Sequence, residues 1–275
     1  MPPRIVAVGD NVVDCYLDRA LMYPGGNCVN VSVFAARFGA DTAYIGAVAN
    51  DPAGSLLRAA LAAEGVDLQR LRIEEGQTAY CVIGNVDGDR VFLSSGKGVS
   101  EIEPDTNDLE FAEYFDAVHV GFSSGLDDSL AEFSRATRLS YDFSTHREAR
   151  HVASVAGLCF LASFSGGDLT EAQLRELLDT SAAAGAEWTL VTRGDRGAIL
   201  ANATQTWLSA ATPTSVIDTL GAGDTFIARV LVGLLRGEDP SAFLPDAAAA
   251  AAATCTRPGA FGFGTDLQLP LHITS

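Results

Sequence analysis

The stretch from Val216 to Phe226 reads VIDTLGAGDTF and joins an extended segment to a helix through a Gly-Ala-Gly turn. After the turn, apolar side chains recur at helical spacing up to Gly237, a residue type that commonly ends helices. The turn is therefore expected at the N-terminus of a helix, where free N–H groups and the helix dipole bind anions. Asp224 falls in the first turn of this helix, beside the predicted anion site.

A carboxylate beside an anion site is a combination suited to phosphoryl transfer. The backbone at Gly221, Ala222 and Gly223 would hold the charge that develops on the moving phosphoryl group. Asp224 would accept the proton of the attacking hydroxyl, as a general base. An isolated Asp at this position is more typical of a helix cap, but the complete run of residues 218–224 favours catalysis.

Outside this stretch, the chain alternates apolar strands with amphipathic helices. Short runs rich in β-branched residues predict buried strands at residues 4–8, 42–48, 117–121, 139–143, 157–162 and 188–193. Helices are expected over 27–38 and 54–64, each followed by Gly, and after Thr170, which can form a capping box with Gln173. This alternation is typical of a largely parallel sheet covered by helices.

Two segments depart from the alternation. The Asp-Gly pair at 87–88 stands between two extended runs, which is a strong signal for a β-hairpin. Such a hairpin would project from a parallel sheet, so we expect a lid built from about residues 11–24 and 77–98 on a single domain of residues 1–275.

The second departure is a further antiparallel pair near a sheet edge. Two more extended runs, at residues 198–202 and 205–210, predict it.

Composition restricts the partners. The chain of 275 residues is 48% hydrophobic, and its 18 Lys and Arg against 35 Asp and Glu give a net charge of −17, without a basic segment. Nucleic acid and anionic membranes are therefore not expected as partners. The chain has no apolar run of about 20 residues and no secretory signal, so we expect a cytoplasmic protein with its five scattered cysteines reduced.

Several motifs resemble those of a known family. The pattern Asp-Thr-x-Gly-Ala-Gly-Asp-x-Phe at 218–226 matches the C-terminal signature of the ribokinase-like (PfkB) carbohydrate kinases at each fixed position. Residues 25–30 resemble the Gly-Gly sugar site of that family, and residues 46–54 resemble the motif that follows it along the chain. Residues 191–197 resemble the nucleotide-binding segment of the family. The resemblance covers nearly the whole chain. It implies a three-layer α/β/α fold with a mostly parallel central sheet and a small β lid, and a phosphotransferase that uses ATP and Mg²⁺.

Within that family, the chain is most similar to the fructoselysine 6-kinase branch. The similarity rests on GDNVVD at 9–14, on DRVF at 89–92 and on YDFS at 141–144. Members of the branch phosphorylate the 6-hydroxyl of a fructosamine, a sugar joined to an amino acid amine. The resemblance therefore implies phosphorylation of a primary hydroxyl of a sugar or a sugar–amine adduct, with Asp224 as base.

The expected substrate site lies at the carboxyl end of the first strand, the edge where open α/β sheets bind ligands. Carboxylates accept hydrogen bonds from sugar hydroxyls, amides donate or accept them, and Gly allows close approach. The predicted substrate-binding residues are Asp10, Asp14, Gly25, Gly26, Asn27, Asn30 and, by resemblance to the lid of these kinases, Arg90. Taken singly, the two Asp residues are also typical of turns and caps, and the Arg of an exposed strand.

The nucleotide site is expected from the resemblance. Its predicted residues are Thr192, Arg193, Gly194, Gly197, Thr219, Gly221, Gly223 and Gly259. An Ala-rich helix over 247–256 would offer a flat surface to the purine, although Ala tracts are also typical of tight helix packing. A Walker loop is excluded because Gly98 follows Lys97, and a dinucleotide fold because Asp10 and Asn11 follow Gly9.

One family feature is missing. Many relatives carry Asn-x-x-Glu after the strand expected at 157–162, where it positions magnesium, but this chain has Ser163-Phe164-Ser165-Gly166. The protein residues that contact the metal therefore stay open, and the resemblance also allows a monovalent cation. Val12 stands where some sugar kinases contact ribose through Asn, which argues against ribose.

Two alternatives remain from the sequence. One is a kinase of the same fold that acts on a nucleoside or another small molecule. The other is a sugar-binding regulator with weak catalysis, suggested by the missing metal motif. A homodimer through the lid is expected by analogy with relatives.

Overall fold

The computed structural model describes residues 1–86 and 89–268, without the side chains of residues 85–92. Its strands form a central sheet in the order β13-β12-β11-β10-β9-β8-β1-β4-β5. The strands are β1 Arg4–Val8, β4 Asp41–Ala49, β5 Leu71–Glu74, β8 Ala117–Gly121, β9 Arg138–Asp142, β10 Cys159–Ser165, β11 Trp188–Thr192, β12 Ala198–Asn202 and β13 Thr206–Ser209. Those from β5 to β11 run parallel, and β12 and β13 continue the sheet antiparallel.

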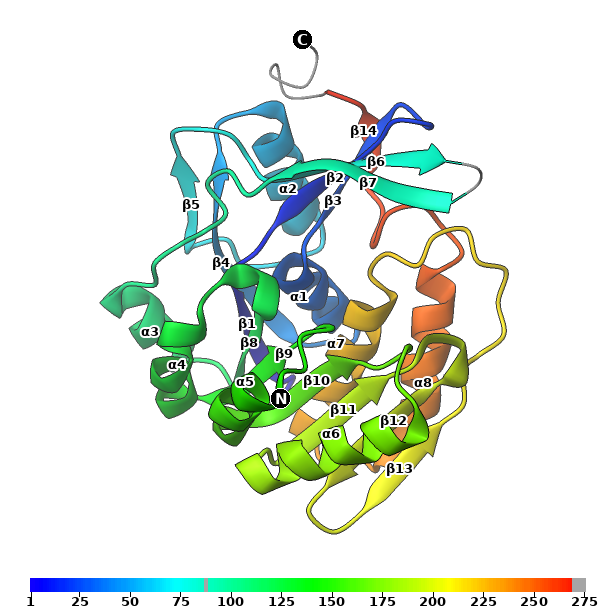
Figure 1. Ribbon diagram of the computed structural model, residues 1–275. Helices are drawn as coiled ribbons and strands as arrows, with labels where there is room; N and C mark the ends of the chain where they lie inside the picture. The colour runs from blue at the N-terminus through cyan, green and yellow to red at the C-terminus, as the bar shows by residue number, and fades with distance from the viewer. Residues whose placement is uncertain (87–88, 269–275) are drawn as a thin grey trace.

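Helices cover both faces of this sheet (Figure 1). One face packs against α1 Asn27–Arg37, α2 Pro52–Ala63, α7 Ala222–Leu235 and α8 Pro240–Thr254. The other packs against α3 Thr106–Ala112, α4 Leu130–Ala136, α5 Ala149–Val155 and α6 Glu171–Ala184. Strands buried on both sides need apolar residues at nearly every position, as in Ile5 to Val8, which are all 0% exposed. The predicted three-layer α/β/α fold is confirmed.

A smaller sheet, called here the lid sheet, has the strand order β14-β3-β2-β6-β7. Its strands are β2 Val12–Tyr16, β3 Leu21–Gly25, β6 Tyr80–Val86, β7 Asp89–Gly96 and β14 Thr265–Asp266. In Figure 1 the lid sheet lies above α1 and α7. Four of its strands fall within the residues predicted for the lid, and the turn residues Asp87 and Gly88 lie outside the described residues.

The predicted elements agree with the structure apart from their ends. All six predicted parallel strands and the antiparallel edge pair are present, and the capping box of Thr170 and Gln173 begins α6. Helix α2 begins two residues earlier than predicted, because the Asp51 carboxylate accepts a hydrogen bond from the Gly54 N–H. Helix α8 begins seven residues before the predicted Ala tract, because Asp239 caps it and Pro240 occupies the first helical position.

No helix within residues 1–86 and 89–268 is long and apolar enough to cross a bilayer.

Candidate active site

The Gly-Ala-Gly turn forms the start of α7, as its sequence predicts. Gly221 is the N-cap with φ 76°, and a Cβ there would lie 2.5 Å from that of Ala260, so the position requires Gly. The next helical turn closes with a bond from Thr225 N–H to the Gly221 carbonyl at 2.9 Å. Among the described residues, the N–H groups of Gly223 and Asp224 have no hydrogen-bond partner. The turn therefore presents free donors at a helix N-terminus.

Asp224 is held by two amides from α1. Asn27 Nδ2 donates to Asp224 Oδ1 at 2.8 Å, and Asn30 Nδ2 donates to Asp224 Oδ2 at 2.6 Å. Burial raises the pKa of Asp224 to about 6; the two amides lower it and Asp10 raises it further. A carboxylate with this pKa is ionised near neutral pH and is a stronger base than an exposed Asp.

A second carboxylate, that of Asp142, is buried at the carboxyl end of β9. Asn27 Nδ2 also donates to Asp142 Oδ2, at 2.9 Å, and the Ser144 N–H donates to Asp142 Oδ1 at 2.8 Å. Burial raises the pKa of Asp142 to about 7, and the charge of Asp224 raises it further. The Asn27 amide thus donates to both Asp142 and Asp224. Neither carboxylate forms an ion pair with a described Lys, Arg or His side chain.

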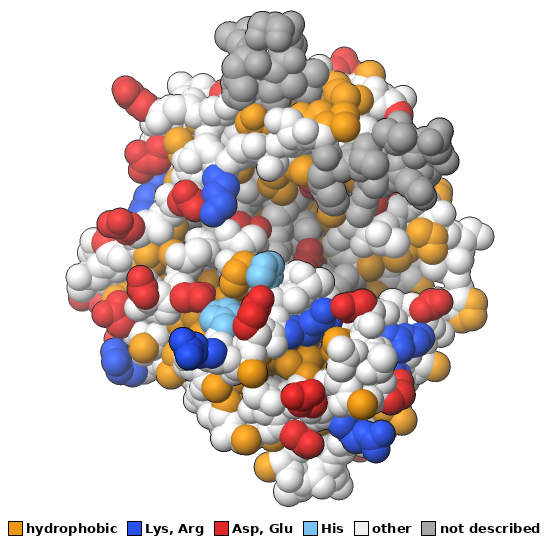
Figure 2. All heavy atoms as spheres, viewed as in Figure 1, with side chains coloured by type: hydrophobic (Ala, Val, Ile, Leu, Met, Phe, Trp, Pro, Cys, Tyr) orange, Lys and Arg blue, Asp and Glu red, His pale blue; other side chains and the backbone are white. Residues whose placement is uncertain are grey.

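These groups open onto a cavity of about 230 Å³. Residues from the carboxyl ends of β9, β10 and β11 and from the start of α7 line it, among them Asp142, Ser144, Ser165, Thr192, Gly223 and Asp224. His146 also lines it and stacks on Phe122, with ring centroids 3.5 Å apart. Figure 2 shows a hollow below the lid sheet, with histidine side chains at its rim. The cavity therefore extends from Asp224 to Thr192 at the end of β11, one of the residues predicted to bind the nucleotide.

Several of the predicted substrate residues lie at the start of α1, and they differ in their contacts. Asp10 accepts the N–H groups of Asn27 and Cys28, at 2.9 and 3.3 Å, and so caps α1. Asp14 is 3% exposed on β2, and a Cβ at Gly25 would lie 2.6 Å from its carboxylate.

Gly26 and Arg90 are two further residues predicted to bind the substrate. Gly26 has φ 106°, and a Cβ there would lie 2.6 Å from Asn11 Cα, so this turn also requires Gly. The side chain of Arg90 lies outside the described residues, and its backbone pairs with Asn85 in the lid sheet.

The predicted nucleotide-binding residues lie at or after the carboxyl end of β11 and near the start of α7. Thr192 lines the cavity, whereas the Arg193 guanidinium pairs with Glu171 at 3.1 Å. Gly194 and Gly197 have φ 60° and 79° and shape the turn after β11. The Gly259 N–H donates to Asp218 Oδ2 at 3.1 Å.

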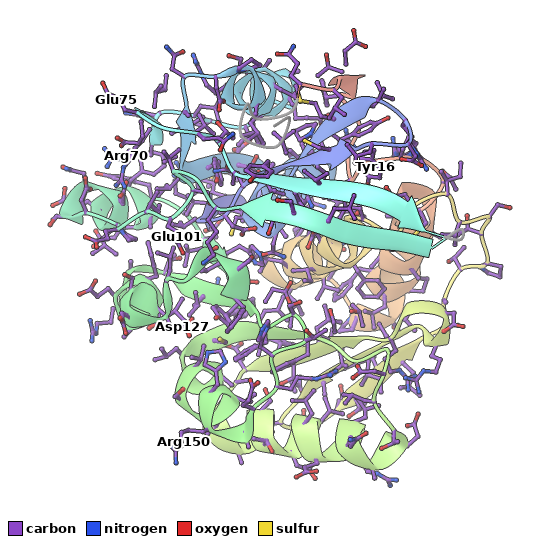
Figure 3. All side chains as sticks on the ribbon, turned by 45° about the horizontal axis from the view of Figure 1, so that its top comes forward. Tyr16, Arg70, Glu75, Glu101, Asp127 and Arg150 are labelled. Carbon is purple, nitrogen blue, oxygen red and sulfur yellow. The ribbon has the colours of Figure 1, made fainter. Side chains whose placement is uncertain are left out.

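Asp218 connects this edge to the lid sheet. Tyr16, labelled in Figure 3, lies on β2. Its hydroxyl donates to Asp218 Oδ2, the oxygen that also accepts the Gly259 N–H. The Thr219 carbonyl accepts the Ala222 N–H at 3.3 Å, so the signature turn follows directly. A strand of the lid sheet therefore contacts the turn that begins α7.

Several residues at the site were absent from the sequence prediction. Asp142, Ser144 and His146 line the cavity, and His119 lies behind Asn27. A signal existed for Asp142, because it ends an expected parallel strand and carboxyl ends of such strands bind ligands. His119 lies inside a strand, and nothing in its local sequence separates it from a core residue.

The site fits ATP better than a protein-held metal ion. The free N–H groups at the start of α7 match phosphate oxygens. Within the described residues, no group of three or more His, Cys, Asp or Glu side chains is arranged to hold a metal ion. The donor set therefore suits Mg²⁺ carried by nucleotide phosphates more than a dedicated metal site.

Replacing Asp142 by Asn is expected to raise the free energy of unfolding at pH 8. Its folded pKa of about 7 exceeds the ordinary value of 3.8, so the folded state binds more protons between these values and loses stability as pH rises. The neutral amide removes this penalty, for a gain on the order of 4 kcal/mol at pH 8 that falls to about half at pH 5.5. Urea denaturation at the two pH values measures it.

Asp168→Asn is the matched control. Arg147 lowers the pKa of Asp168 to about 2, so this substitution should bring no gain at pH 8. An Asp142→Asn protein that is less stable than wild type at pH 8 contradicts the prediction.

Comparison with known proteins agrees with this geometry. The model of the pfkB family carbohydrate kinases matches residues 5–263. Fructosamine kinase FrlD of Bacillus subtilis (strain 168) is 37% identical over 271 residues, which are 97% of this chain and 95% of that protein. Fructoselysine 6-kinase of Escherichia coli (strain K12) is 31% identical over 94% of this chain and 99% of that protein.

Solved structures share the fold at lower identity. Arabidopsis thaliana ribokinase, complexed with ribose and ATP, has a TM-score of 0.82 at 22% identity, over 94% of this chain and 95% of that one. An Escherichia coli chain described as a ribokinase II, in complex with ATP and Mg²⁺, has a TM-score of 0.80 at 19% identity, over 94% of both chains. The arrangement of layers and lid sheet is therefore one that kinase structures share.

Proposed function

The chain belongs to the pfkB family of carbohydrate kinases, and on this premise we propose that it transfers the γ-phosphate of ATP to the primary 6-hydroxyl of a fructosamine. The observation that carries the proposal is the placement of Asp224. Its carboxylate is half-buried, oriented by Asn27 and Asn30, and adjacent to the free N–H groups that begin α7. This is the arrangement that phosphoryl transfer to an alcohol requires.

The chain's own groups divide the chemistry between them. Above pH 6, Asp224 is ionised and accepts the proton of the sugar hydroxyl as the hydroxyl oxygen attacks the γ-phosphorus. The N–H groups of Gly223 and Asp224 stabilise the charge on the phosphoryl oxygens. Mg²⁺ bound together with ATP would neutralise part of the phosphate charge. The lid sheet would exclude water and so limit hydrolysis of ATP.

The polar groups near Asp224 favour a polyol that carries an amine. Asn30 is 3% exposed, and its Oδ1 has no hydrogen-bond partner among the described residues, so it can accept a bond from a sugar hydroxyl. Asp10 and Asp142 add carboxylates around the base, and the net charge of −17 favours a cationic substrate over an anionic one. The two curated relatives, named for fructosamine and fructoselysine, act on such adducts.

The test is a coupled ADP-release assay with three classes of acceptor. Fructoselysine and other fructosamines, free fructose, and nucleosides would each be titrated at saturating ATP. We expect kcat/KM for fructoselysine to exceed that for fructose by about tenfold or more, and nucleosides to be inert. Turnover of nucleosides alone would refute the proposal. Sugar binding without ADP release for any acceptor would instead favour a regulator.

Three further expectations from the sequence stay predictions. They are a homodimer through the lid, a bound monovalent cation, and a cytoplasmic location.

A further inference from the structure

Two fully buried polar side chains lie beneath the proposed base. His119 on β8 and Ser140 on β9 are opposite each other in the parallel register, and both are 0% exposed. Their neighbours in the same row of the sheet are apolar, Ala7 on β1 and Leu161 on β10. Polar groups in such a layer are costly unless they are hydrogen-bonded, so their contacts identify what they do.

The contacts form a chain that ends at Asp224. The Ser140 hydroxyl lies 3.0 Å from His119 Nδ1, and His119 Nε2 lies 2.9 Å from Asn27 Oδ1. Asn27 Nδ2 then reaches Asp142 and Asp224 at 2.9 and 2.8 Å. All the polar side-chain atoms of Asn27 are thus engaged by protein groups.

The donor and acceptor roles along this chain are determined. Asp224 is ionised near neutral pH and its oxygens then only accept, so the Asn27 atom that faces it must be its NH₂ group. The Asn27 oxygen therefore faces His119, and His119 must donate through Nε2–H. Its Nδ1 then accepts the Ser140 hydroxyl proton. Burial lowers the pKa of His119 to about 3, so the ring stays neutral at the pH values at which a kinase works.

Resting on the proposed function, we propose that His119 is a positioning residue for phosphoryl transfer, which fixes the orientation of the Asn27 amide and through it the carboxylate of Asp224. If the amide were flipped, its oxygen would face two carboxylates and both N–H bonds would be lost. The Nε2–H of His119 favours the productive orientation, because only the amide oxygen can accept from it. The Asn27 side chain has a different task from the substrate contact that the sequence suggests.

The first test compares His119→Leu with His119→Gln, because the Gln amide retains an N–H donor near the place of Nε2. With the acceptor that the wild type phosphorylates, His119→Leu should lower kcat by about 10- to 100-fold and change both KM values less than about threefold. His119→Gln should recover most of this loss. Ser181→Ala, which removes a buried hydroxyl pair with Thr189 on α6 and β11, controls for general loss of stability and should leave kcat unchanged.

A double-mutant cycle tests the route through Asn27. In an Asn27→Ala background, adding His119→Leu should lower kcat by less than about twofold, because the group that His119 orients is already absent. Independent, multiplicative losses would overturn the proposal. Equal losses for the Leu and Gln variants would overturn it as well.

A titration without substrate separates this proposal from the proposed function. The Asp224 carboxyl, assigned by comparison with Asp224→Asn, is followed by ¹³C NMR as pH changes. In His119→Leu, the pKa of Asp224 should rise by about half a pH unit or more, because a hydrogen bond that lowers it is weakened. An unchanged pKa overturns the positioning role. A raised pKa in a protein that phosphorylates no acceptor leaves the positioning role standing and rejects the kinase.

Discussion

Asp224→Asn is expected to lower kcat by about 10³-fold, while the fold and the affinity for ATP are retained. Asn has the shape of Asp but cannot accept the proton of the attacking hydroxyl. The substitution leaves the free N–H groups at the start of α7 in place, so nucleotide binding should change little. Steady-state kinetics with the preferred acceptor, together with calorimetric titration of ATP, measure the two effects.

The wild-type pH profile supplies a second readout of the same residue. Because the pKa of Asp224 in the free protein is raised to about 6, kcat/KM for the acceptor should fall as pH is lowered through that value and the base becomes protonated. Asp179→Asn, an exposed carboxylate on α6, is the matched control and should retain wild-type kinetics. An Asp224→Asn enzyme with more than about a tenth of wild-type kcat would exclude general-base catalysis by this residue.

Gly223→Val is expected to lower kcat/KM for ATP by about 100-fold without unfolding the protein. Gly223 lies in the first turn of α7 and lines the cavity, and a Cβ there would meet no atom within 4 Å. The added side chain therefore enters the space beside the free N–H groups, where the phosphate would lie, and leaves the protein core undisturbed.

The melting temperature shows whether a loss of activity comes from a blocked phosphate site or from unfolding. Gly223→Val should melt within about 3 °C of wild type. Ala172→Val, at the equivalent second position of α6, should be neutral for both activity and stability. Gly221→Val provides the contrast, because its Cβ would overlap Ala260 and it should destabilise the fold. Unimpaired turnover of ATP by Gly223→Val would contradict a phosphate site at the start of α7.

The parts that the sequence predicts well are those with local signals. The Gly turn before Asp224, the capping box at Thr170 and the apolar runs of the parallel strands each carry their structure within a few residues. The seven-residue helices α3, α4 and α5 have too few turns to show an apolar periodicity, and the two-residue strand β14 exists only because it pairs with β3. These elements depend on contacts made after the chain has folded.

In the candidate site, too, some residues have a local sequence signal and others depend on contacts made in the folded chain. Asp224 could be assigned from its own motif, whereas Asp142 and His119 act through Asn27, which lies 115 and 92 residues away. The sequence predicts Asp10 and Asn27 as substrate contacts, but the polar atoms of both also hold protein groups, the start of α1 and the two buried carboxylates. Spacing along the chain gives no sign of partners that parallel strands bring together.

Identification of the product tests whether this protein phosphorylates the 6-hydroxyl of a fructosamine. The protein would be incubated with ATP, Mg²⁺ and fructoselysine, and the products examined by ³¹P and ¹H NMR. We expect one ADP for each sugar phosphorylated, with the phosphate on the primary 6-hydroxyl, and formation of this product slowed by about 10³-fold in Asp224→Asn. Phosphate on another hydroxyl, or ADP with free phosphate and unmodified sugar, would contradict it.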